Sequence, residues 1–155
     1  MVKRIRGSSA DFERALERLK RAEVRVGFFA HSRYEDGTPI AGVAATQELG
    51  SVVERIPARP FFGPAIDQGK TANARGIAKA VSNALAGGDL KQGLELVGQK
   101  VVGDIQKKIT EVTMPPLSPV TIAARAARHS KGLASTKPLI DTGAMLAAVT
   151  YEVDA

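Results

Sequence analysis

The chain has 155 residues, of which 44% are hydrophobic, 25% are charged and 5% are aromatic, and it contains no cysteine. These proportions indicate one soluble domain with an aliphatic core, and they exclude disulfides and thiolate metal sites. The net charge of +6 favours an anionic partner, either nucleic acid or an acidic protein surface, although basic and acidic residues alternate in most segments as on an ordinary solvated surface.

The first elements predicted along the chain are a helix and a strand. Apolar residues recur at helical spacing over residues 8–22, and Ser8 with Asp11 resembles a capping box at the start of that helix. Residues 23–30 then alternate between apolar and polar side chains, which is typical of a half-buried strand.

A polar turn and a second helix follow. Asp36-Gly37 is a turn signal. The helix is expected to begin with Thr38 as its N-cap and Pro39 at the first helical position, and to run to about Glu48. Gly50 then ends it by supplying the left-handed conformation that a helix stop often needs.

The chain next passes through a proline-rich segment, Ile56–Ile66, around which the fold is expected to turn. Proline fixes φ and disfavours helix in the residue before it, so residues 55–59 are expected to run extended as an edge strand. Phe61 and Phe62 are expected to be buried, and Pro64 fits the first turn of a long helix.

Two long helices are predicted in the middle of the chain. The first covers residues 64–86 and stops at Gly87-Gly88. Asp89 is expected to cap the second, in which apolar residues repeat at threes and fours in the clearest amphipathic pattern of the chain. The residues of that pattern are Leu90, Leu94, Val97, Val101, Ile105, Ile109 and Val112.

A loop around Pro115-Pro116 leads to a short basic helix. Ser118-Pro119 is the expected N-cap and first-turn pair, and the helix is expected to run to about Arg128. Residues 129–137 are small, polar and basic, and we expect them, like residues 1–7, to form a flexible arm.

The chain is expected to close with a helical turn and a strand. Asp141 or Thr142 would cap a turn that contains Met145, and residues 149–153 alternate as a strand. The sequence therefore predicts one α+β domain over residues 1–155, in which a small antiparallel sheet packs with several helices, one or two of them long and amphipathic.

One tripeptide, Asp141-Thr142-Gly143, has an enzymatic interpretation, because retroviral-type aspartic proteases carry it after an apolar pair. The twelve residues after Gly143 are too few for the strands and flap that would enclose a substrate, so a helix cap is the favoured interpretation. The histidines, His31 and His129, lie far apart, and there is no nucleophile elbow or phosphate loop. We therefore expect no enzymatic activity, no cofactor and no metal.

Basic residues support an alternative function, that of a small, non-sequence-specific nucleic-acid-binding protein. Such a protein contacts phosphates without reading bases, and this chain lacks an aromatic platform on which bases could stack. The candidate phosphate contacts are Arg4, Arg6, Arg125, Arg128, Lys131 and Lys137.

Three strings stand out together. They are Gly42–Gly50, an alanine-rich helix that ends in Glu-apolar-Gly; Ile56–Phe62 followed by Pro64-Ala65-Ile66; and Pro116–Pro119 with Thr121, then Lys137–Gly143 and Tyr151–Val153. In this order they resemble the tail-completion, or head–tail joining, proteins of tailed bacteriophages and prophages, which include neck and tail-terminator proteins. The resemblance covers roughly residues 24–153.

The resemblance implies a structural virion protein that forms a homohexameric ring at the head–tail junction, completing or capping the tail tube and joining it to the head connector. Its partners would be further copies of itself, the tail-tube protein and connector or stopper proteins, with DNA only as passing cargo and no membrane. It would reside in the virion, and in the host cytoplasm during assembly. Candidate assembly contacts are Arg59, Phe61, Phe62, Asp141, Met145 and Tyr151, and candidate basic contacts to the channel or a partner are Arg125, Arg128 and Lys131.

Overall fold

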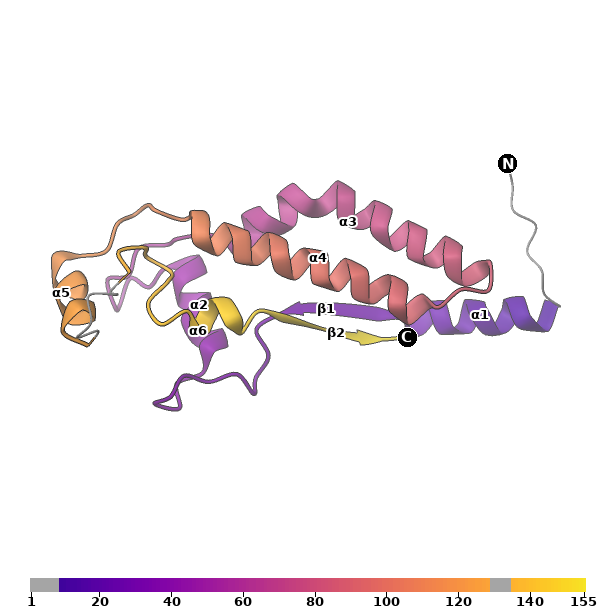
Figure 1. The fold of residues 1–155 in the computed structure, drawn as a ribbon, viewed down its shortest axis with the longest axis horizontal. Coiled ribbons are helices and arrows are strands. Elements are labelled where there is room, and N and C mark those ends of the chain that lie inside the picture. The colour runs from indigo at the N-terminus through magenta and orange to yellow at the C-terminus, as the bar shows by residue number, and fades with distance from the viewer. Residues whose placement is uncertain (1–8, 129–134) are drawn as a thin grey trace. The chain divides into compact units, whose positions relative to one another are not determined.

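The structure, a computed structural model, describes residues 9–128 and 135–155 (Figure 1). These residues form six helices and one antiparallel sheet of two strands, which is the α+β class that the sequence predicts. The helices are α1 (Ser9–Arg21), α2 (Ile40–Leu49), α3 (Phe62–Leu85), α4 (Leu90–Glu111), α5 (Pro119–Arg128) and α6 (Ala144–Ala147), and the strands are β1 (Glu23–Gly27) and β2 (Thr150–Asp154).

The described chain forms two compact units. Unit 1 comprises residues 9–27, 68–102 and 150–155, and unit 2 comprises the described residues of 28–67 and 103–149. Each unit draws on segments that lie far apart in the sequence, so neither is a separate stretch of chain. The single domain expected for residues 1–155 stays a prediction.

The sheet of unit 1 pairs a strand near the start of the described chain with the strand at its end. β1 and β2 are antiparallel, with Arg25 opposite Glu152 and Val26 opposite Tyr151. One face is charged, because the Arg25 guanidinium lies 3.3 Å from the Glu152 carboxylate and 2.9 Å from that of Asp154. The valines of β1 are half-buried on the other face. The predicted alternation is confirmed, although β1 ends three residues earlier than expected.

Helices α3 and α4 approach closely in unit 1 because of small residues. A Cβ placed on Gly93 of α4 would lie 2.7 Å from the Ala80 Cβ of α3, and one placed on Gly98 would lie 2.6 Å from the Tyr151 ring. Neither distance is possible for a real side chain, so glycine at both positions lets α4 pack against its neighbours. The sequence patterns did not single out these two glycines.

The core of unit 2 is built on the amphipathic stripe of α4. Ile105 and Ile109 are fully buried there, as is Phe61, whose ring meets Phe28 edge-on with 6.1 Å between centroids. The same stripe continues through buried residues of α4 in unit 1. The predicted period is therefore confirmed over the helix; its buried members are Leu94, Val97, Val101, Ile105 and Ile109.

The edge strand expected over residues 55–59 is absent from the described chain, and that prediction was wrong. Residues 51–56 form a tight turn closed by mutual backbone hydrogen bonds between Ser51 and Ile56, in which Arg55 has a positive φ of 54°. Pro57 and Pro60 have no N–H to give to a ladder, which explains why no strand continues from the Ser51–Ile56 bridge along residues 57–60. Phe62, expected to be buried, is half-buried.

Several helix ends match the predicted signals. Asp89 Oδ1 accepts the Gln92 N–H at 3.3 Å, and Ser118 Oγ accepts the Thr121 N–H at 3.2 Å. Gly50 ends α2 as predicted and has a positive φ of 75°, but its ψ of 171° lies outside the left-handed helical conformation that was expected.

Two caps differ from their predictions, and a third lies outside what is described. Pro39, not Thr38, is the N-cap of α2, and the Thr38 N–H donates to Asp36 Oδ1 at 2.9 Å. Gly143, with φ 83°, occupies the N-cap position of α6, but Thr142 Oγ1 accepts the N–H of Ala144, the first residue of that helix, at 3.3 Å. The Ser8–Asp11 capping box falls outside the described side chains.

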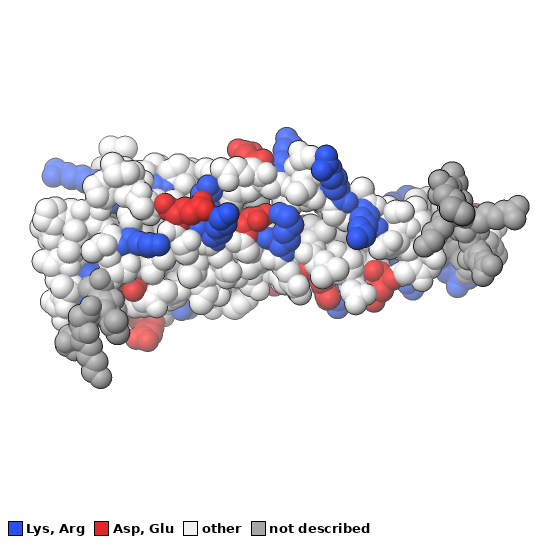
Figure 2. All heavy atoms as spheres, turned by 45° about the horizontal axis from the view of Figure 1, so that its top comes forward, with Lys and Arg blue, Asp and Glu red and all other residues white. Residues whose placement is uncertain are grey.

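The charges of the described residues are nearly balanced. Four of the 22 Lys and Arg residues, and none of the 16 Asp and Glu residues, lie in residues 1–8 and 129–134, which leaves 18 basic against 16 acidic residues. Figure 2 shows both signs intermixed on the face that it draws. Most of the net positive charge therefore belongs to segments outside the described structure.

Candidate functional site

Glu48, near the end of α2, caps the start of α3 from a distance in sequence. Its Oε2 accepts the N–H groups of Phe61 and Phe62 at 2.7 and 2.8 Å, and its Oε1 accepts that of Gly63 at 2.9 Å. The first amides of a helix have no partner within the helix and carry a partial positive charge, so a carboxylate is well suited to them. One side chain thus joins α2 to α3.

Arg59 links the same region to the loop before α5. Its backbone N–H donates to the Gln47 carbonyl at 2.7 Å, and Nη1 donates to Gln47 Oε1 at 3.0 Å. Its Nε and Nη2 donate to the carbonyls of Pro115 and Pro116 at 2.8 and 3.1 Å. All three guanidinium nitrogens are used, which is what a residue only 5% exposed requires.

The burial of Arg59 has an electrostatic cost. Burial first, and then the like charge of Arg125, lower the pKa of the Arg59 guanidinium below its usual value. Arginine nevertheless keeps its proton in proteins, so the charge stays and must be met by the carbonyl dipoles around it. Arg59 thereby fixes Pro115 and Pro116 through their carbonyls, since proline has no backbone N–H through which it could be held.

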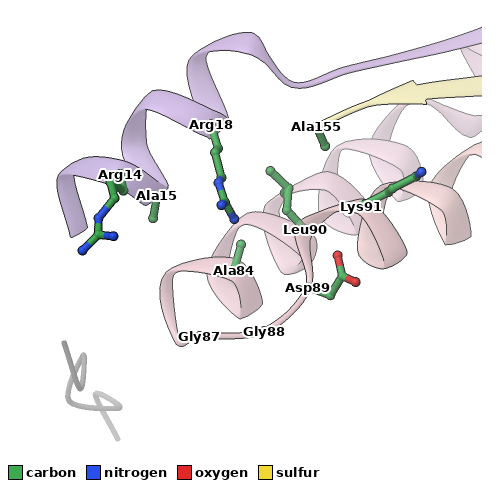
Figure 3. Close-up of a pocket in the computed structure, with 10 residues that line it drawn as sticks. All are labelled: Arg14, Ala15, Arg18, Ala84, Gly87, Gly88, Asp89, Leu90, Lys91 and Ala155. Atoms are coloured by element: carbon green, nitrogen blue, oxygen red, sulfur yellow. The ribbon is translucent and has the colours of Figure 1, made fainter. Parts of the chain in front are cut away.

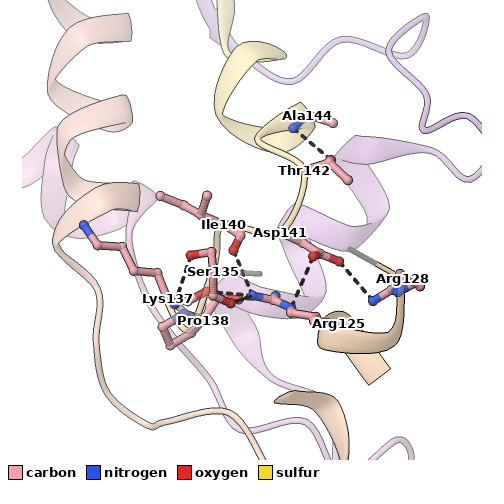
Figure 4. A network of polar contacts seen from close by, with 9 residues as sticks. All are labelled: Arg125, Arg128, Ser135, Lys137, Pro138, Ile140, Asp141, Thr142 and Ala144. Carbon is pink, nitrogen blue, oxygen red and sulfur yellow. Dashed lines mark hydrogen bonds and ion pairs between the residues drawn. The ribbon is translucent and has the colours of Figure 1, made fainter. Parts of the chain in front are cut away.

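Arg125 organises the segment after residue 134 in the same way (Figure 4). It is the buried residue of α5, 8% exposed, and its guanidinium donates to four backbone carbonyls. These are the carbonyls of Ser135, Lys137 and Ile140, at 3.2, 2.8 and 2.8 Å from Nη1, and of Pro138, at 3.0 Å from Nη2. Because Nη1 has only two hydrogens for three acceptors, the longest contact, to Ser135, is a shared one.

Asp141 completes this cluster. Its Oδ1 lies 3.7 Å from Arg125 Nε and its Oδ2 lies 3.0 Å from Arg128 Nη2. With Tyr34 it lines a cavity of about 80 Å³, far below the volume of ordinary ligand pockets. Burial first, then the charges of Asp141 and Asp36, raise the pKa of the Tyr34 hydroxyl, while Arg125 opposes the shift. Asp141 therefore acts as an ion-pair partner in a scaffold.

The structure buries four of the nine predicted contact residues. Buried are Arg59, Phe61, Arg125 and Met145; half-buried are Phe62, Asp141 and Tyr151; Arg128 is exposed, and Lys131 lies outside the described residues. Unit 2 brings together all of the described ones except Tyr151, which belongs to unit 1 and accepts a hydrogen bond from Gln99 at 3.2 Å. Because the four buried residues expose little surface, they are not proposed as contacts to a partner.

The sequence patterns missed an exposed apolar turn that directly follows α2. Val52 and Val53 are 96% and 94% exposed, and Leu49 is 78% exposed. The turn is nonetheless well built, because Ser51 Oγ accepts the Glu54 N–H at 3.1 Å beside the two backbone bonds of Ser51 and Ile56. Two adjacent β-branched residues, separated by Ser51 from the helix-ending Gly50, were the only signal available, and they fit a strand equally well.

Comparisons place no further constraint on this site. Among residues 9–128 and 135–155, no group of three or more His, Asp or Glu side chains could hold a metal ion. No helix of the described chain combines the length and the apolar character needed to cross a membrane. Comparison of the chain with protein-family models, curated proteins and solved structures finds no match.

Proposed function

We propose that this chain is a structural protein of a tailed bacteriophage or prophage that assembles into a ring at the head–tail junction. There it completes or caps the tail tube and joins it to the head connector. The proposal starts from the three strings that resemble tail-completion proteins, each of which is a weak signal alone. The ring would contain six copies on the grounds of that resemblance.

The observation that carries the proposal is that the first two strings and the part of the third that ends at Gly143 meet in unit 2. Glu48 of the first string binds the Phe61–Gly63 amides of the second, and Arg59 of the second binds the Pro115 and Pro116 carbonyls where the third begins. Arg125, which lies between the two parts of the third string, then holds residues 137–140 of that string. Residues from all three strings thus share one partly buried polar scaffold, which supports treating them as one motif.

The exposed turn supports a role in assembly. A turn that places two valines almost wholly in water gains free energy when a partner covers them, at about 25 cal/mol per Å² of apolar surface buried. Because the turn is closed by its own hydrogen bonds, little conformational entropy is lost when it docks. The exposed apolar residues of this region are Leu49, at the end of α2, and Val52 and Val53, in the turn that follows it.

The sheet offers a second surface that a ring would use. Within the described chain it has only two strands, so β1 and β2 each leave one edge without a strand partner. Two-stranded sheets are marginally stable alone, and open edges invite pairing with another chain. A closed ring of copies can cover such edges and apolar contacts at every junction.

The decisive measurement is native mass spectrometry of the purified chain at micromolar concentration, alone and with tail-tube protein. We expect a closed oligomer, and a Val52→Asp/Val53→Asp variant should be a folded monomer because charged side chains replace the apolar contacts. Ala78→Asp/Ser82→Asp, which adds the same charge on exposed positions of α3, is the matched control and should still assemble. An unmodified chain that stays monomeric even with tail-tube protein present would contradict the proposal.

A further inference from the structure

Unit 1 contains a pocket that the proposed function does not use (Figure 3). It lies between α1 and the turn that joins α3 to α4, and its volume is about 490 Å³, within the range of small-molecule sites. Arg14 and Arg18, one helical turn apart on α1, line one side, and Gly87-Gly88 with the start of α4 lines the other. In Figure 3 Arg18 points from α1 towards that turn.

The charge of the lining is positive. Its lining includes three basic side chains, those of Arg14, Arg18 and Lys91, and one acidic side chain, that of Asp89, which already accepts the Gln92 N–H. Among the described residues Arg18 makes no hydrogen bond or ion pair, whereas Arg14 is engaged along its own helix with the Ala10 carbonyl. The guanidinium of Arg18 is therefore available to a ligand without breaking an existing contact.

The start of α4 adds backbone donors on the same side. This helix has 22 residues, and its first amides, those of Leu90 and Lys91, find no acceptor among the described residues. Such amides carry the positive end of the helix dipole and bind anions readily. A planar guanidinium opposite two free amides matches the oxygens of a phosphate group better than it matches a neutral ligand.

We infer that this pocket, lined by Arg14, Arg18 and the first residues of α4, binds a phosphate group. The phosphate is either a free ion or nucleotide, or one phosphate of a DNA backbone, since both present the same tetrahedral anion to the site. The inference does not depend on ring formation, because all of the lining residues belong to unit 1 of one chain.

Isothermal titration calorimetry with the full chain tests the inference, using inorganic phosphate in one series and a short duplex DNA in another. Arg18→Gln should weaken phosphate binding by about tenfold or more, because it removes a charge-assisted pair. Arg75→Gln on α3, an exposed arginine outside the pocket, is the matched control and should bind like the unmodified chain. Both arginines are exposed, so neither change is expected to disturb folding.

The two series distinguish the source of the phosphate. Duplex binding that falls steeply with salt, with a shallower slope for Arg18→Gln than for Arg75→Gln, assigns the pocket to backbone phosphate. Phosphate binding without duplex binding assigns it to a small ligand. The inference is overturned if the unmodified chain binds neither, if both variants lose binding equally, or if polyglutamate binds more tightly than either probe.

Discussion

Replacing Glu48 by alanine removes a side chain that joins the end of α2 to the start of α3. In the structure its carboxylate accepts three N–H groups, at 2.7, 2.8 and 2.9 Å. Alanine supplies no acceptor, so the three amides at the start of a 24-residue helix lose their partner in a partly buried place. Glutamine keeps one acceptor oxygen but loses the charge and the second oxygen.

The geometry sets the size of the effect. A hydrogen bond to a charged group contributes about 1.5–3 kcal/mol, but water can reach part of this site and replace some of each bond, so we take about 1 kcal/mol for each of the three. Glu48→Ala should then lower the free energy of unfolding by about 3 kcal/mol, and Glu48→Gln by about 1–2 kcal/mol. For a chain of this length about 3 kcal/mol corresponds to a fall in Tm of roughly 6–12 °C.

Urea unfolding followed by circular dichroism measures the difference, with the m-value checked for constancy so that the change reports stability alone. Glu54→Ala is the matched control, because Glu54 is exposed in the neighbouring turn and should change the free energy by less than about 0.5 kcal/mol. The reasoning is refuted if Glu48→Ala costs no more than the control, or if the glutamine variant is as unstable as the alanine variant.

Two further outcomes follow from packing and titration. Gly93→Ala should destabilise the chain by about 1–3 kcal/mol, because the new Cβ would meet Ala80. Gly103→Ala lies in the same helix with open space around it, so it should stabilise the chain by about 0.5–1 kcal/mol. Thermal unfolding in which the Tm of both variants moves in the same direction would contradict this. Since the pKa of Tyr34 is raised above 10.0, the folded chain keeps that proton longer, so stability should fall as pH rises beyond 10. Tyr34→Phe should lose less stability over the same alkaline range in urea unfolding, and equal losses would show that Tyr34 does not contribute.

Local signals predicted the helices well because their causes are local. The apolar stripe of α4 has a helical period that needs no knowledge of the fold, and Asp89 and Ser118 cap amides only three residues away. The first strand was predicted for the same reason, since its alternation is set by neighbouring residues. Pro64 likewise takes its expected place in the first turn of α3.

The proline-rich segment shows where local reasoning failed. Proline and extended backbone suggested a strand, but a strand also needs a partner with a free edge, and the local sequence carries no information about one. Residues 51–56 instead close on themselves as a turn. This turn puts Val52 and Val53 into solvent, although their β-branched side chains favour a half-buried sheet.

The candidate site depended on the tertiary structure for a further reason. Arg59 was identified by its position in a string, but its acceptors, Pro115 and Pro116, lie 56 and 57 residues away. Arg125 looked like a surface cation on a basic helix, and only the return of the chain after residue 134 surrounds it with carbonyls. From the sequence alone, an arginine whose guanidinium is hydrogen-bonded to water cannot be distinguished from one whose guanidinium is hydrogen-bonded to backbone carbonyls.

The sequence by itself determined the α+β class, the two long helices, the period of the α4 stripe and several of the helix ends, because each of these results from interactions within a few residues. Only the tertiary structure decided that Glu48 caps a different helix, that two arginines are buried, and that a pair of valines is exposed. Those features depend on which distant donors and acceptors meet, and folding alone brings them within hydrogen-bonding distance.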